Sequence, residues 1–280
     1  MLKIKSLLFI LLIGFITSSM AQEKTPFDLG IEQFQSENYT AAYETFTSDA
    51  LKNNDQAQFL VGHMLLFGIG TEKQPSQAYE QLEKSAQAGN ANAQSYMGTI
   101  YHKGELVTRD DKEAAKWLLL AADNGVAEAQ NNLAHMYING QGVESSLEKA
   151  FHWFQKASEQ GFTEAKLSLG LMYEQGIFIE QDFSRAAELY QSAADQGSAQ
   201  GMHNIGMMLL YGNGFEQHTD NACSFLTTAA KLGFQDSIKN LNTLIGKGVC
   251  KKAAPDPHSN SIVEPSFEPF SLNPTIGAPH

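Results

Sequence analysis

Hydrophobic and polar positions follow a pattern that returns every 36 residues along most of this chain. Within each interval, apolar and small residues recur at helical spacing in two segments, and a glycine follows each segment. A fixed period of this length predicts a stacked array of small helical units. The positions that recur in register are Gly62, Gly98, Ala134, Gly170 and Gly206, then Gly68, Gly104, Gly140, Gly176 and Gly212, then Ala78, Ala114, Ala150, Ala186 and Ala222, and finally Gly89, Gly125, Gly161, Gly197 and Gly233.

The segment 91–126 indicates how one unit folds. Its first half carries apolar or small residues at helical spacing and ends at Gly104, which can adopt the positive φ of a helix C-cap. Asp110 and Asp111 offer a cap and favourable charge to a second helix, which Gly125 ends. Each unit is therefore predicted to be helix, loop, helix and turn.

Small residues inside the predicted helices indicate why the units stack. Gly98 falls in the middle of a helix, where Gly costs up to ~1 kcal/mol relative to Ala. A position that returns to Gly or Ala despite this cost indicates close approach between helices. Aromatic residues recur between the small ones, as Tyr101 and Trp117 do, and are predicted to form the core.

Two runs of residues resemble the signature of the Sel-1-like repeat family. They are Ala129-x-x-x-Leu133-Ala134-His135-Met136-Tyr137-x-x-Gly140-x-Gly142-Val143 and Ala150-x-x-Trp153-x-x-x-Ala157, which leads to Gly161. The resemblance implies an all-α fold, a right-handed α/α superhelical solenoid of antiparallel helix pairs related to tetratricopeptide repeats. It also implies a scaffold for protein–protein contacts. The implied units are 55–90, 91–126, 127–162, 163–198 and 199–234.

The chain departs from the family pattern in two ways. In the fourth unit, Ile177-Phe178-Ile179 replaces the expected Gly and Val, so we expect a loop that is more apolar or differently shaped. The chain also lacks the cysteine pair in each repeat of the disulfide-rich secreted members, to which penicillin-binding or lactamase activity is attributed. That absence argues against this branch of the family.

The repeat register also describes both ends of the array. In residues 22–54 the second helix keeps the repeat register, but the small residue of the first helix lies four residues nearer to it than in the other units. This shorter spacing predicts an atypical, tetratricopeptide-like capping pair. Residues 235–250 match only a first helix and are predicted to close the array. Cys223 and Cys250 then fall near the same end of the last helical hairpin. We predict a disulfide between them, with two free thiols as the alternative.

The two termini differ in character from the array. Residues 1–21 combine Lys3 and Lys5 with an apolar run and a small-residue cleavage site, which predicts a signal peptide cut after Ala21. We therefore expect a periplasmic or secreted protein with no stable membrane insertion after cleavage. The Pro-rich residues 251–280 are predicted to be a disordered tail, in which 264–270 is either a docking motif or inert.

Charge and motifs argue against several classes of function. The net charge of −12 argues against nucleic acid as a partner and favours a neutral or basic one. His63 and His135 share a repeat phase but lie two units apart, too far for one metal ion. Asp110 and Asp111 are interpreted as helix caps. We predict no catalytic residues, no cofactor and no metal, and hence no enzyme.

The remaining candidate site is one face of the first helices. The resemblance implies that these positions are exposed and line the concave groove of the stack. Unlike the packing positions, they differ between units, as expected for a shaped groove and equally for neutral drift on a solvated face. They are Phe59, His63, Leu66, Ser95, Thr99, His102, Asn131, His135, Ile138, Leu167, Leu171, Glu174, His203, Met207 and Leu210.

These observations predict a non-catalytic exported scaffold or adaptor that binds a protein or peptide partner. The middle of the groove is polar and both ends are apolar, which favours an extended segment or a helix as the ligand. One alternative is a cell-wall-related or β-lactamase-like enzyme or penicillin binder. Another is a secreted factor that acts on a host. The sequence does not name a partner.

Overall fold

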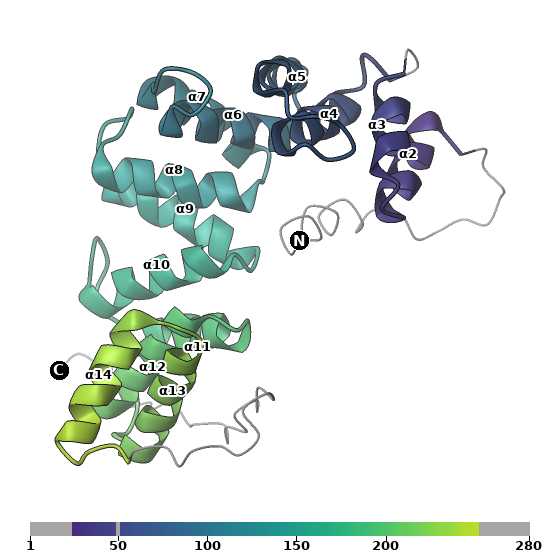
Figure 1. Cartoon of the computed structure of the whole chain (residues 1–280). Helices are drawn as coiled ribbons and strands as arrows, with labels where there is room; N and C mark the ends of the chain where they lie inside the picture. The colour runs from purple at the N-terminus through teal and green to yellow at the C-terminus, as the bar shows by residue number, and fades with distance from the viewer. Residues whose placement is uncertain (1–23, 49–50, 252–280) are drawn as a thin grey trace.

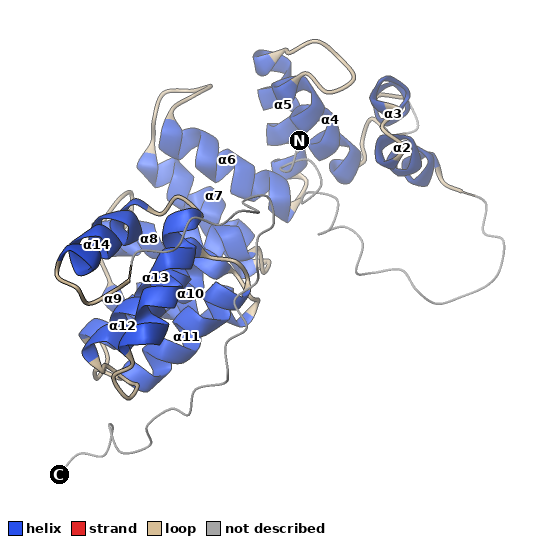
Figure 2. Ribbon diagram, turned by 60° about the horizontal axis from the view of Figure 1, so that its bottom comes forward, coloured by secondary structure: helices blue, strands red, loops and turns tan. Residues whose placement is uncertain are grey.

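The computed structural model describes residues 24–48 and 51–251, which contain helices and no strands (Figure 2). The predicted signal peptide and the tail from residue 252 onward lie outside the described residues. The helices are α2 (Pro26–Gln35), α3 (Tyr39–Phe46), α4 (Asp55–Phe67), α5 (Pro75–Gln87), α6 (Ala91–Lys103), α7 (Asp111–Asp123), α8 (Ala127–Asn139), α9 (Leu147–Glu159), α10 (Thr163–Gln175), α11 (Phe183–Asp195), α12 (Ala199–Tyr211), α13 (Thr219–Lys231) and α14 (Gln235–Gly246).

Short polar and glycine residues set the ends of these helices. The side chain of Asn90 accepts a hydrogen bond from the Ala93 N–H at the start of α6, and Asp110 caps α7 in the same way. Gly104 ends α6 with a φ of +69°, in the left-handed region that glycine adopts without a steric penalty. The equivalent glycine ends each of α4, α8, α10 and α12, so the predicted C-caps are confirmed.

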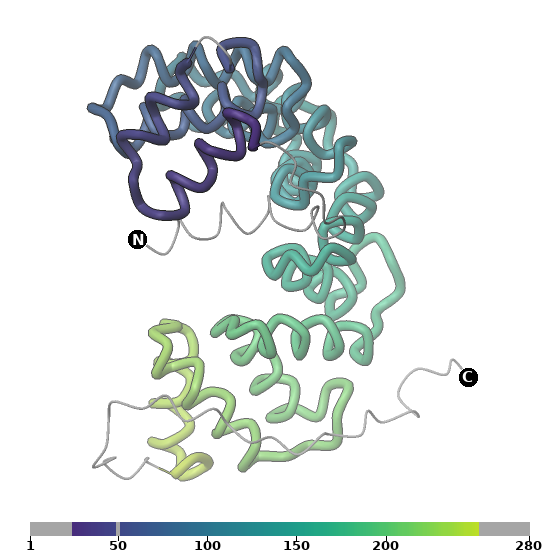
Figure 3. The backbone as a smooth tube through the Cα atoms, turned by 90° about the vertical axis from the view of Figure 1, so that its right-hand side faces the viewer, coloured from purple at the N-terminus to yellow at the C-terminus, as the bar shows by residue number. Residues whose placement is uncertain are grey.

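The helices form consecutive pairs that stack along the chain. Each pair, such as α6 with α7, packs as a hairpin, and the second helix of one pair packs on the first helix of the next. The stack runs from α2 at one end to α14 at the other (Figure 1). Seen from the side, the backbone follows an open arc (Figure 3). The predicted all-α solenoid is confirmed.

Helices within a pair approach closely at the recurring small residue, which is Ala134 in the third repeat and glycine in the other four. A Cβ atom built on Gly98 would lie 2.5 Å from Cγ of Leu118 and 3.2 Å from the carbonyl oxygen of Ala114. Gly62 faces Leu82 and Gly206 faces Leu226 in the same manner. The interpretation of these small residues as sites of close helix packing is confirmed.

Alternating small and large side chains fill the space between layers. Phe154 and Tyr190 lie on second helices and are fully buried. Alanines on the same helices, such as Ala150 and Ala186, are fully buried as well. Tyr101 and Trp117 are only partly buried, and the Tyr101 hydroxyl lies 3.0 Å from that of Tyr79. The aromatic positions therefore contribute to packing, but not all of them are core.

A disulfide joins Cys223 on α13 to Cys250, which follows α14. Gly248, with φ of +71°, turns the chain after α14, and the N–H of Val249 donates to the carbonyl oxygen of Leu244. The chain thereby returns to the start of α13, as the repeat register predicts. None of the described helices is both long and apolar enough to cross a bilayer.

We predict that Gly98→Ala destabilises the protein by ~1–3 kcal/mol, because the added methyl group overpacks a site where Leu118 is buried. Gly246→Ala is the matched control. A Cβ at Gly246 meets nothing within 4 Å, so this change should be neutral or stabilising by up to ~1 kcal/mol. Urea unfolding followed by circular dichroism gives both values. Equal stability of the two variants would contradict the close-packing account.

We also predict that the disulfide forms in the isolated protein. Intact mass after alkylation should show no added groups without reductant and two with it. Replacing both cysteines by serine should cost ~3 kcal/mol, because the closed loop spans 27 residues. Two alkylated thiols in the unreduced protein would contradict the pairing.

Candidate functional site

The first helices α4, α6, α8, α10 and α12 carry the candidate site. We call the side chains predicted above to line the groove the first-helix face. The structure exposes three of them, His135, Ile138 and Leu171. The expectation that all are exposed is wrong for five, because packing within and between the first helices buries them: Phe59, His63, Ser95, Asn131 and Leu210.

An aromatic cluster occupies the α4 end of the first-helix face. The His63 ring lies 4.5 Å from that of Phe67 and 6.0 Å from that of Tyr96, between ring centroids, and Phe59 contacts it as well. Burial lowers the pKa of His63 to about 4, so the ring is neutral at neutral pH. Phe67 is 47% exposed. The cluster thus presents an apolar ring to solvent above a buried imidazole.

The middle of the face is polar. Asn131 is only 6% exposed, and its Oδ1 atom is buried without a hydrogen-bond partner. One turn later, His135 packs edge-on against Phe154 with 4.9 Å between ring centroids. The residue as a whole is exposed, and partial burial of the ring lowers its pKa. On α6, the Thr99 hydroxyl donates to the Ser95 carbonyl oxygen.

His102 belongs to a charged cluster at the start of α7. Its Nδ1 lies 2.8 Å from Oδ1 of Asp111. The guanidinium of Arg109 donates to both oxygens of the same carboxylate. These hydrogen bonds, with Arg109 contributing most, lower the pKa of Asp111. His102 is therefore held by the neighbouring helix start.

The α10–α12 half of the face combines apolar and internally paired groups. Leu171 is 42% exposed, whereas Glu174 accepts a hydrogen bond of 2.8 Å from the buried hydroxyl of Tyr190. His203 forms a hydrogen bond of 2.7 Å with Ser237 of α14. Asn131 occupies the same repeat position as His203. The residue that corresponds to Ser237 is then Ala165, which has no hydrogen-bonding side chain. Leu66, Leu167 and Met207 are partly buried.

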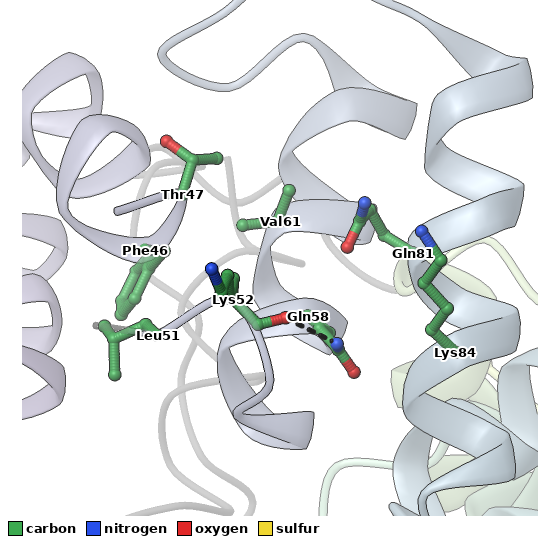
Figure 4. Close-up of a pocket in the computed structure, with 8 residues that line it drawn as sticks. All are labelled: Phe46, Thr47, Leu51, Lys52, Gln58, Val61, Gln81 and Lys84. Atoms are coloured by element: carbon green, nitrogen blue, oxygen red, sulfur yellow. Dashed lines mark hydrogen bonds between the residues drawn. The ribbon is translucent and has the colours of Figure 1, made fainter. Parts of the chain in front are cut away.

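Outside this face, a cavity of about 240 Å³ lies between α3 and the first repeat (Figure 4). Its lining combines apolar side chains with amides and amines. No motif in the sequence indicates this cavity, because its wall forms only when the consecutive helices α3, α4 and α5 and the segment between α3 and α4 pack together. The lining residues are Phe46, Thr47, Leu51, Lys52, Gln58, Val61, Gln81 and Lys84.

One Ser-x-x-Lys spacing, at Ser146 and Lys149, matches the motif of penicillin-recognising serine enzymes. In the structure, Ser146 caps α9 by accepting a hydrogen bond from the Lys149 N–H. The Lys149 ammonium lies 5.2 Å from the centre of the Tyr137 ring. Both residues thus have a structural role. Within the described residues, no cluster of three or more His, Cys, Asp or Glu could hold a metal ion.

The fold and the face together define a class: an α/α solenoid of short helix pairs with a variable surface on its first helices. A model of the Sel1 repeat matches residues 55–90, 91–126, 127–162, 163–198 and 199–234. The chain therefore belongs to the Sel1 repeat family, and the resemblance seen in the sequence is confirmed. Proteins built from Sel1 repeats generally act as non-catalytic scaffolds for protein–protein interaction.

The solved structures that are similar to this one include two bacterial proteins. A Sel1 repeat protein from Oxalobacter formigenes is 25% identical with a TM-score of 0.77, over 87% of this chain and 100% of that one. c5321, a protective antigen present in uropathogenic Escherichia coli strains, displays an SLR fold and is 26% identical with a TM-score of 0.73, over 89% of this chain. The match spans 52% of the c5321 chain, about half its length. A comparison with curated proteins found no match.

We predict that His63 makes stability depend on pH. Its pKa is lowered on folding from 6.5 to about 4, so the unfolded chain binds a proton in this window and the folded chain does not. Protonation of this group should lower the free energy of unfolding by roughly 3 kcal/mol as the pH falls from 6.5 to 4. Above pH 6.5 this stability is fully present, because the ring is then neutral in both the folded and the unfolded chain.

Urea unfolding at several pH values measures this contribution. The slope of the unfolding free energy against pH reports the difference in bound protons between the unfolded and folded chains. His63→Phe should reduce that difference by nearly one proton between pH 4 and 6.5. His152→Phe, at an exposed position of α9, is the control and should leave the slope unchanged. Identical slopes for the wild type and His63→Phe would show that the ring is not buried as described.

Proposed function

We propose that this protein is an exported, non-catalytic scaffold that binds a protein or peptide partner on the first-helix face. The observation that carries the proposal is the exposure of Ile138 and Leu171 on this face, at 37% and 42%. Exposed apolar side chains on a surface that several units share favour a partner that covers them. Family membership supports the scaffold role.

Helix packing supports placing this face on the inside of the arc. Besides contacting the second helices on either side, α6 contacts α8 directly. First helices of neighbouring units approach one another in this way when they lie on the inner, compressed side of a curved stack. A partner bound there touches several units at once.

The chemistry of the face suggests the kind of partner. Phe67, which packs on His63 beside the face, and Leu171 toward the other end are exposed apolar anchors, and the polar side chains of Asn131 and His135 lie between them. An extended segment or an amphipathic helix with separated apolar anchors fits this order. The chain's net charge of −12 favours a neutral or basic segment.

The proposed location outside the cytoplasm rests on two features. The Cys223–Cys250 disulfide suggests an oxidising compartment. Residues 1–21 have the composition of a signal peptide. Together they support a periplasmic or secreted scaffold.

The test compares paired substitutions on the two helix faces. Ile138→Glu with Leu171→Glu changes the first-helix face at exposed positions, so the fold should be kept. Leu119→Glu with Leu120→Glu makes the same change at exposed positions of α7, a second helix. A partner captured by cross-linking in the native host, and then purified, serves as the ligand in a titration.

We expect the first-helix pair to weaken binding at least tenfold and the α7 pair to change it less than twofold, because desolvated anchors carry most binding energy. The reverse order would move the binding surface to the second helices.

A further inference from the structure

Phe178 occupies a backbone position that suits glycine. It lies in the loop 176–182 between α10 and α11, with φ of +70°, and its side chain is 51% exposed. Gly142 and Gly214 take the same place in neighbouring units, with φ of +69° and +73°. A phenylalanine is strained in this conformation, and here its ring gains little burial in return.

The neighbouring loops show how close this position lies to the preceding unit. A Cβ at Gly214 would lie 2.7 Å from the carbonyl oxygen of Phe183 at the start of α11, and one at Gly142 would clash with the backbone of Asp111 at the start of α7. The same register places Phe178 beside Leu147 at the start of α9. The Phe178 side chain is thus held at the loop edge of the stack.

Phe178 is part of an apolar surface. Its ring lies 5.9 Å from that of Phe151, between centroids, and Phe151 lies one turn after Leu147 on α9. Leu147 is 40% exposed and Phe151 is partly buried. We call Leu147, Phe151 and Phe178 the loop-edge patch. It belongs to the helix starts and loops and is separate from the first-helix face.

We propose that a segment of this same chain, residues 262–270, docks on the loop-edge patch, with Phe267 and Phe270 against Phe178 and Phe151. The sequence of this segment is Ile-Val-Glu-Pro-Ser-Phe-Glu-Pro-Phe. It holds the only Phe, Tyr or Trp side chains after residue 234.

The spacing of the two phenylalanines suits one apolar surface. Pro265 and Pro269 favour the polyproline II conformation, which has three residues per turn. Side chains three residues apart share one side of that conformation, and three residues is the spacing of Phe267 and Phe270 in the sequence. Proline also lowers the conformational entropy lost on docking.

The exit of the chain brings the segment within reach. The disulfide fixes Cys250 beside the start of α13, at the same edge of the stack as the loops and the other second-helix starts. From α13 to α9 there are four helix-to-helix steps, at most ~40 Å in total. The 16 residues from Lys251 to Ser266, which connect Cys250 to Phe267, span up to ~53 Å when extended. Tethering at this range gives an effective concentration on the order of millimolar, so a weak contact suffices.

Hydrogen–deuterium exchange on the whole protein tests the proposal. Phe267→Ser with Phe270→Ser should speed amide exchange at least fivefold in residues 144–151 and 176–182. Leu272→Ser with Ile276→Ser removes two apolar side chains just beyond the segment and is the matched control, expected to leave exchange unchanged. Equal exchange in the two variants would overturn the proposal.

A synthetic peptide of residues 260–271 provides a second measurement. It should bind the Phe267→Ser, Phe270→Ser protein, and further substitution of Phe178→Gly should weaken binding at least tenfold. Gly is the residue that neighbouring loops carry, so this variant is expected to fold. Leu120→Ser on α7 should have less than a twofold effect. A peptide that does not bind, or that ignores Phe178→Gly, would refute docking at this patch. Partner binding on the first-helix face is unaffected by either result.

Discussion

The structure depends on one contact that recurs in successive units: a glycine in the first helix lies directly against a large side chain in the middle of the second. Gly98 meets Leu118, and Gly170 meets the ring of Tyr190. This contact brings the two helices of a pair close together, and its return with the 36-residue period allows the pairs to stack in register. A Cβ added to Gly98 in this seam between the two helices would press on the Leu118 side chain and disturb the layers on either side.

The seam divides the residues of each unit into two groups. Residue types in and around the seam recur because the close packing there allows little variation in side-chain volume. Positions on the first-helix face have different neighbours in each unit and need not repeat. His203 and Asn131 illustrate this: they share a register, but His203 pairs with Ser237, whereas the Oδ1 atom of Asn131 has no partner and Ala165 stands where Ser237 would be. Family membership therefore explains the fold and leaves the surface to define the partner.

The sequence predicted the architecture well because the period and the glycines report directly on backbone geometry. Gly104 and Gly98 each had one physical interpretation, and the cysteine pair had a disulfide as the favoured one of two; the structure agrees with all three. The site was less predictable. Burial of His63 depends on rings from α4 and α6 that meet only after stacking, and the pairing of His102 with Asp111 depends on the loop path between helices. Helical spacing places a residue on a face but does not say how neighbouring layers cover it.

The central claim is that repeating positions determine stability and non-repeating positions on the first helices determine binding. Saturation mutagenesis scored twice, once for folded protein and once for partner binding, tests it most directly. The account predicts that variants which fold but lose binding cluster on the exposed first-helix face, around Ile138 and Leu171. Variants in the seam, such as those at Gly98, should lose both together. Binding-specific losses concentrated on the second helices would contradict the account.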